Sequence, residues 1–167
     1  LHNAAYMNNP EVVKIILDAY PQAASKKDKY GRLPLHIAAE VENKNPEVVK
    51  IILDANPEAA KVKDDYGMLP LHYAANNKNP KVVKIILDAY PKAAAEKDDD
   101  GRFPLHLVAS KSNPGLVGMI LHAYPQAAFE KDKYGQFPLH HAASNLNPKV
   151  VRIILHAYPE AAAKRDG

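Results

Sequence analysis

The chain has 167 residues, of which 47% are hydrophobic and 25% charged, a composition typical of an ordinary folded protein. The formal net charge is +3 and no basic block appears, which argues against binding to nucleic acid. The absence of cysteine excludes disulfides and thiolate metal sites, and fits an intracellular, reducing compartment of unknown identity. No apolar stretch reaches the roughly 18 residues of a membrane helix, so this segment is not expected to insert into a membrane.

A repeated unit dominates the sequence. Pro-Leu-His occurs at positions 34–36, 70–72, 104–106 and 138–140, and Leu-His opens the chain at 1–2, so the histidines are 34 or 36 residues apart. Such a period is typical of arrays in which each repeat is one supersecondary unit stacked on its neighbours. We expect a single array of about four and a half repeats, with a partial copy at 1–27 followed by 28–63, 64–97, 98–131 and 132–167.

One complete repeat, residues 64–97, shows the expected elements in order. Asp64 and Gly67 occupy the first and fourth positions of a type I turn. A short helix is predicted from Pro70, because proline is well tolerated in the first helical turn. Asn79 is a typical N-cap for a second helix, which Pro91 ends or kinks.

The second helix of this repeat is apolar on nearly all sides. Only Lys84 and Asp88, four residues apart, form a narrow polar stripe. A helix of this kind is normally buried on most of its surface, and in a short repeat that burial must come from the repeats before and after it.

The order of these motifs resembles the ankyrin repeat: a turn of the form Asp-x-x-Gly, then Pro-Leu-His-x-Ala-Ala, then Val-Val in a leucine-rich helix. The resemblance recurs in register along the whole chain. It implies an all-α fold, an ankyrin-type α-solenoid of stacked helix pairs with projecting β-turn or hairpin loops.

The chain departs from the ankyrin pattern in two places. The family's threonine before proline is replaced by Leu33, Leu69, Phe103 and Phe137, so the usual bond between that threonine and the histidine is absent. Tyr-Pro-x-Ala-Ala follows the second helix in place of the family's Gly-Ala-Asp-Val-Asn, and we expect an extra helical turn beginning at its proline. The variant is similar to ankyrin repeats of some unicellular algae.

The repeated histidines and aspartates are predicted to be structural. Equivalent histidines should be separated like packed helices, by about 8–10 Å, which is too far for one metal ion. Nothing breaks the register to assemble a nucleophile with a base. We therefore expect no catalytic residues, no metal site and no cofactor, and we predict that the chain is not an enzyme.

The ankyrin resemblance implies a protein–protein interaction module that binds through the concave surface of turn tips and first helices. Exposed tyrosines at the tips favour this hypothesis, because tyrosine is favoured at interfaces. The predicted partner-binding residues are Lys29, Tyr30, Arg32, Asp65, Tyr66, Met68, Tyr73, Asn76, Asn77, Asp99, Asp100, Arg102, Ser110, Lys111, Lys133, Tyr134, Gln136, His141, Ser144 and Asn145. Nothing in the sequence identifies the partner protein.

The alternative function is architectural, with the chain serving as a subunit or spacer of a larger assembly, bound by its flanks or ends. The first and last copies lack the polar substitutions of capping repeats, as Val13 and Val151 illustrate. Uncapped arrays expose apolar faces. We therefore expect the chain to be a segment of a longer protein and to self-associate through its ends.

The fourth copy carries Gly115 and Gly118 in its second helix. Each helical glycine costs about 0.5–1 kcal/mol relative to alanine, so this helix is predicted to be the weak point of the array.

Overall fold

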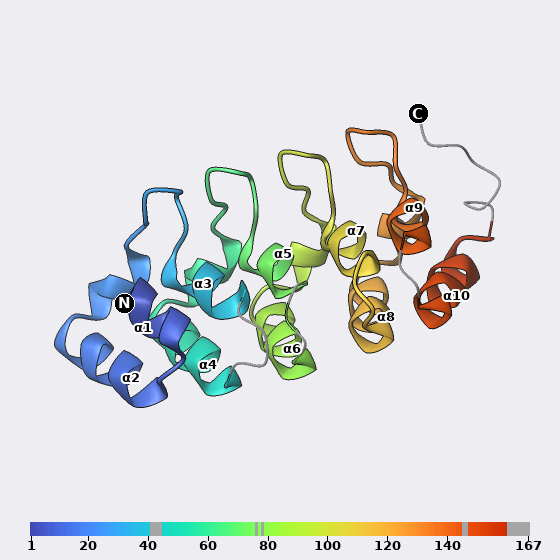
Figure 1. Ribbon diagram of the computed structural model, residues 1–167. Coiled ribbons are helices and arrows are strands. Elements are labelled where there is room, and N and C mark those ends of the chain that lie inside the picture. Colours follow the sequence, from blue (N-terminus) through green and yellow to red (C-terminus); the bar gives the residue numbers. More distant parts are fainter. Residues whose placement is uncertain (41–44, 76, 78, 145–146, 160–167) are drawn as a thin grey trace. The chain divides into compact units, whose positions relative to one another are not determined.

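The computed structural model describes residues 1–40, 45–75, 77, 79–144 and 147–159, and its described secondary structure is helical (Figure 1). Each repeat has a short first helix and a longer second helix, as predicted. The first helices are α1 (His2–Met7), α3 (Pro34–Glu40), α5 (Pro70–Ala74), α7 (Pro104–Ala109) and α9 (Pro138–Ala143). The second helices are α2 (Pro10–Ala19), α4 (Pro46–Ala55), α6 (Pro80–Ala89), α8 (Pro114–Ala123) and α10 (Pro148–Ala157).

Local sequence sets the start of each second helix. An asparagine precedes the first proline, and its side-chain oxygen accepts a backbone N–H of the first turn, as Asn9 does from Val12 at 3.2 Å. The bond satisfies one of the amide groups that the helix leaves unpaired at its N-terminus. The predicted cap is confirmed at Asn9, Asn45, Asn79, Asn113 and Asn147.

The predicted extra turn after each second helix is also confirmed, as a 3₁₀-helix that starts at proline. These turns are η1 (Pro21–Ser25), η2 (Pro57–Lys61), η3 (Pro91–Ala95) and η4 (Pro125–Phe129). The residue before the proline leaves the helical backbone region, as at Tyr20 with φ −147° and ψ 80°, because proline disfavours helical backbone in its predecessor. The two alanines of each turn are buried, so the turn packs beneath the helices.

The chain forms two units, Leu1–Ala93 and Ala94–Gly167, each with its own packing. In the first unit α1 packs on α3 and α3 on α5, while α2 packs on α4 and α4 on α6. In the second unit α7 packs on α9 and α8 on α10. Within each unit, a repeat therefore buries its apolar face against the next, as the sequence predicted.

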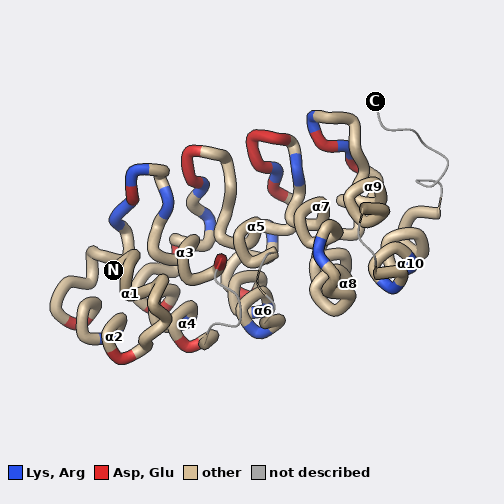
Figure 2. Tube along the Cα trace, viewed as in Figure 1, with Lys and Arg blue, Asp and Glu red and all other residues tan. Residues whose placement is uncertain are grey.

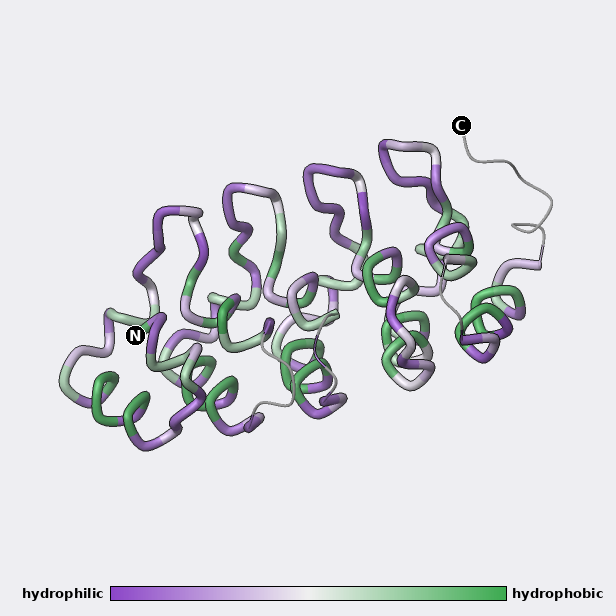
Figure 3. The backbone as a smooth tube through the Cα atoms, viewed as in Figure 1, coloured by the Kyte–Doolittle hydropathy of each residue, from purple (hydrophilic) through white to green (hydrophobic). Residues whose placement is uncertain are grey.

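Leucine and isoleucine side chains fill the space between the helices. In the first unit Ile52, Leu71 and Ile86 are fully buried, and in the second Leu105 and Ile120 are no more than 1% exposed. Figure 3 shows the contrast, with hydrophobic helices and hydrophilic hairpin loops. Burial of one such side chain contributes roughly 1.5–3 kcal/mol.

Gly118→Ala is expected to raise the free energy of unfolding by roughly 0.5–1 kcal/mol, because alanine restricts the unfolded chain and favours the helix. A Cβ atom built at Gly118 meets no other atom within 4 Å, so the added methyl group fits without rearrangement. Urea-induced unfolding of the two proteins measures the difference. An unchanged or lower midpoint would mean that the glycine is needed in α8.

Candidate protein-interaction surface at the hairpin tips

Four loops precede the first helices α3, α5, α7 and α9, and each folds into a tight turn. In the first loop the Asp28 N–H donates to the Arg32 carbonyl at 2.9 Å, and the Gly31 N–H donates to the Asp28 carbonyl at 3.1 Å. Gly31 has φ +73°, a left-handed conformation that glycine adopts without steric cost. In each unit these loops project beside the first helices, and Figure 2 shows charged residues along them.

The first residue of each turn, which we call the turn aspartate, organises its loop. The turn aspartates are Asp28, Asp64, Asp98 and Asp132. In each, one carboxylate oxygen accepts the backbone N–H groups two and four residues further on, at 2.8–2.9 Å. These bonds hold the loop in shape, because both amides would otherwise lack partners inside the turn.

In two loops the second carboxylate oxygen binds an arginine from the same turn. Arg32 Nε donates to Asp28 Oδ2, and Arg102 Nε to Asp98 Oδ2, each at 2.9 Å. The Asp98 side chain is only 1% exposed, so Arg102 supplies the charge that a buried carboxylate needs.

In the other two loops that oxygen binds a side chain of the following first helix. Tyr73 Oη donates to Asp64 Oδ2 at 2.5 Å, and His141 Nε2 lies 2.8 Å from Asp132 Oδ2. The two arrangements alternate along the chain. Where the turn contains arginine, the helix position that could reach the turn aspartate holds an apolar residue. Where the turn contains Met68 or Gln136 instead, that helix position holds a polar residue. The apolar helix residues are Ile37 and Leu107.

These bonds shift the pKa values of the groups that form them. Burial opposes charge on Asp132, but the bonds from His141 and from two backbone amides hold the pKa of that carboxyl below its ordinary value. The pKa of Asp28 is also below its ordinary value. Burial opposes the charge there too, but bonds from two backbone amides and from the Arg32 side chain outweigh it. Burial and the bond to the Asp64 carboxylate raise the pKa of Tyr73 far above that of a free phenol.

Within each unit, a repeated histidine ties a first helix to a neighbouring loop. His36 Nδ1 accepts the Leu33 N–H at 3.0 Å, so the proton of the neutral ring lies on Nε2, which donates to the Met68 carbonyl at 3.2 Å. His106 likewise accepts the Phe103 N–H and donates to the Glu130 carbonyl. The expected structural role is confirmed for these two rings, and the backbone supplies the partners that the missing threonine does not.

Adjacent tips are joined within each unit. In the first, the Asp65 N–H donates to the Tyr30 carbonyl at 3.1 Å. In the second, the Lys133 N–H donates to the Asp100 carbonyl at 2.9 Å, and the Lys133 ammonium forms an ion pair with the Asp100 carboxylate. The tips of one unit therefore form a continuous surface rather than separate loops.

Most of the predicted partner-binding residues are at least partly exposed. Those that are exposed are Lys29, Tyr30, Asp65, Tyr66, Asp99, Ser110, Lys111, Lys133, Tyr134 and Ser144. Those that are half-buried are Arg32, Met68, Asp100, Arg102, Gln136 and His141. Asn76 and Asn145 lie outside the described residues.

The prediction is wrong for Tyr73 and Asn77, which are 7% and 1% exposed. Tyr73 faces inward because its hydroxyl bonds Asp64. Asn77 Nδ2 donates to the Ala39 carbonyl of the preceding repeat at 3.0 Å, and its Oδ1 accepts the Asn79 N–H. Neither side chain is available to a partner.

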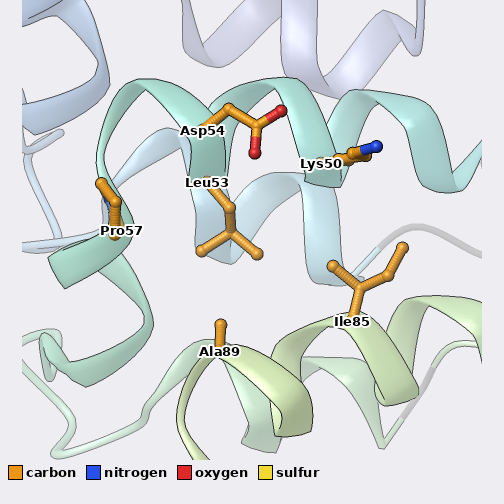
Figure 4. Close-up of a pocket in the computed structure, with 6 residues that line it drawn as sticks. All are labelled: Lys50, Leu53, Asp54, Pro57, Ile85 and Ala89. Carbon is orange, nitrogen blue, oxygen red and sulfur yellow. The ribbon is translucent and has the colours of Figure 1, made fainter.

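Sequence reasoning did not anticipate grooves between the second helices of the first unit. One, with a volume of about 390 Å³, lies between α4 and α6 (Figure 4). Leu53, Ile85 and Ala89 form its apolar floor, and Lys50 and Asp54 stand at its rim. The spacing of Lys50 and Asp54, four residues apart on one helix face, is the signal that would have indicated a polar rim.

Across the described residues, no group of three metal-ligating side chains gathers at one point, and no helix has the length and apolarity to span a membrane. The described part of the chain consists of repeated helix pairs, and their loops carry exposed polar and aromatic side chains.

Comparison with known families identifies this class. Residues 1–97 and 90–165 match the family model of ankyrin repeats in three copies, so the chain belongs to the ankyrin repeat family. No curated protein matches the chain. Ankyrin repeats are generally protein–protein interaction modules and are typically not enzymes.

Proposed function

We propose that the chain binds a partner protein through the hairpin tips and the exposed parts of the first helices. The observation that carries the proposal is the exposure of Tyr30, Tyr66 and Tyr134, at 39%, 55% and 58%. These rings occupy the same turn position in three loops, on a backbone fixed by the turn aspartates. A tyrosine held in this way offers a large contact area and loses little side-chain entropy on binding.

Replacing Tyr30, Tyr66 and Tyr134 together with alanine is expected to weaken binding by at least about 30-fold, the size of a hot-spot loss. Because the partner is unidentified, peptides selected from a random display library on the unaltered chain serve as probes. Circular dichroism should be nearly unchanged, since the three rings are exposed.

The matched control replaces Lys14, Lys50 and Lys81, exposed residues of the second helices, with alanine. Selected peptides should retain their affinity for this control. Peptides that bind the tyrosine variant fully but lose affinity for the second-helix variant would contradict the proposal and favour the architectural function.

The second candidate function is self-association through the face formed by α1, α2 and Tyr20. Val12 is 41% exposed, whereas the equivalent Val48 and Val82 are 1% and 0% exposed because the preceding repeat covers them. Other large apolar side chains on this face are exposed as well: Tyr6 at 61%, Met7 at 73%, Ile15 at 61% and Tyr20 at 48%. Such an apolar surface fits the apolar side of another helix-pair repeat.

Residues 1–167 are expected to sediment as dimers or larger species at micromolar concentration. Val12→Glu with Ile15→Lys should return the protein to a monomer, because burying these charges at the contact is unfavourable. Lys81→Glu with Lys92→Glu, on exposed positions elsewhere, is the control and should leave association intact. Sedimentation of the unaltered chain as a monomer at these concentrations would rule out self-association.

A further inference from the structure

The first hairpin differs in charge from the equivalent loops. Residues 26–32 contain four basic residues and one acidic residue, whereas residues 62–68 of the next loop contain one basic and two acidic residues. Figure 2 shows the change, with basic residues along the first loop and acidic residues at the tip of the second. The difference comes mainly from Lys26 and Lys29, whose equivalents are Val62 and Asp65.

The lysines of the first hairpin are available to a ligand. Lys26, Lys27 and Lys29 are exposed, and among the residues that the structure describes none of the three forms an ion pair with a carboxylate. Arg32 is different, because its guanidinium is held by the turn aspartate Asp28 at 2.9 Å. The three lysines therefore supply the positive charge that this loop exposes to solvent.

An aromatic ring stands beside these charges. Lys29 Nζ lies 4.9 Å from the centroid of the Tyr30 ring, and Arg32 Cζ lies 5.0 Å from it. Cation–π contacts of this length hold the ring at the tip. Tyr66 is exposed on the next loop, which the Asp65 N–H joins to the Tyr30 carbonyl. The two joined tips thus carry two exposed rings, one of them beside the Lys29 ammonium.

From this arrangement we infer that the first hairpin binds an acidic segment of a partner protein, with carboxylates at Lys26, Lys27 and Lys29 and an apolar side chain against Tyr30 and Tyr66. The inference rests on the proposed function and assigns it a partner chemistry. Complementary charge of this kind chiefly sets specificity and the rate of association.

The extent of the charge favours an acidic peptide over a nucleic acid. A nucleic acid backbone needs a basic stripe that continues over many phosphates. Here the basic region ends at the next loop, where Asp65 is exposed, and the Glu40 side chain at the end of α3 is 44% exposed. Those carboxylates repel a long polyanion but leave room for a short acidic segment.

The test uses a fluorescently labelled peptide that places a phenylalanine in the middle of a run of glutamates, with binding followed by anisotropy. Lys26→Glu, Lys27→Glu and Lys29→Glu are combined in one variant of residues 1–167. The matched control combines Lys14→Glu, Lys50→Glu and Lys81→Glu, which reverses the same number of exposed lysines on second helices of the same unit.

The hairpin variant is expected to lose at least about tenfold in affinity, and the control less than about threefold, because only the first places negative charge at the contact. Binding should also weaken as the salt concentration rises from about 0.05 M to 0.5 M, since salt screens exposed charges. Equal losses in the two variants, or no binding to the unaltered chain, would overturn the inference, as would tighter binding of a single-stranded DNA oligonucleotide.

Failure of the inference is distinguishable from failure of the proposed function. If library-selected peptides depend on the three tip tyrosines but are not acidic, and lysine reversal leaves them bound, the tips remain the interaction surface and only the partner chemistry is wrong. If the tyrosines have no effect either, the proposed function fails as well.

Discussion

Lowering the pH from 7 to about 4.5 is expected to reduce the free energy of unfolding by about 2 kcal/mol through His106 alone. Burial of this ring, together with the nearby His141, lowers its pKa from 6.5 to about 4. Its side chain is fully buried, and Nδ1 must be unprotonated to accept the Phe103 N–H. The folded state therefore requires the neutral ring.

Proton uptake by the unfolded chain determines that acid lowers, rather than raises, the free energy of unfolding. Between pH 6.5 and 4 the unfolded chain binds a proton at His106 that the folded chain does not, so acid favours unfolding in this interval. Burial also lowers the pKa of His36, which adds to the effect in the same direction. The turn aspartates Asp28 and Asp132, whose pKa values lie below 3.8, destabilise the fold only at lower pH.

Urea unfolding followed by circular dichroism at pH 7 and pH 4.5 measures this loss. His106→Gln should cost stability at pH 7 but narrow the difference between the two pH values, because its side chain does not titrate. His122→Gln, at an exposed position, is the control and should change neither value by more than about 0.5 kcal/mol. A free energy of unfolding that is constant from pH 7 to 5 would contradict the assignment.

The parts of the fold that were predictable from sequence depend on local rules. Proline fixes its own backbone and restricts its predecessor, so the helix starts and the turn after Tyr20 could be placed before the structure was known. The asparagine before Pro10 predicted the helix cap for a similar local reason. Its short side chain can accept a backbone N–H group of the first helical turn. The repeat period supplied the packing partners, since each apolar helix needs neighbours.

The predicted binding site was less accurate, because the exposure of a side chain depends on the hydrogen bonds that it forms inside the chain. Tyr73 occupies a first-helix position that the ankyrin resemblance places on the binding surface, but its length lets the hydroxyl reach the turn aspartate. Asn77 is buried because its amide reaches a carbonyl of the preceding repeat. One signal was present in the sequence: turns without arginine are followed by Tyr73 or His141 in the helix, and turns with arginine by an apolar residue.

Tyr73→Phe is expected to lower the free energy of unfolding by roughly 1.5–3 kcal/mol, because it removes the donor from the Asp64 carboxylate and changes little else in shape. Asp64 is only 7% exposed, so water replaces that donor poorly. Tyr66→Phe, which removes a hydroxyl at an exposed ring of the same loop, is the matched control and should fall within about 0.5 kcal/mol of the unaltered protein.

The alternation of donors also predicts a rescue. Met68 holds the turn position that Arg32 and Arg102 occupy in the other arrangement, four residues after the turn aspartate. Met68→Arg added to Tyr73→Phe should therefore return at least half of the lost stability, because arginine can donate to Asp64 Oδ2 from within the turn. If the double variant is no more stable than Tyr73→Phe, the two donors are not interchangeable, and the alternation has no energetic basis in this loop.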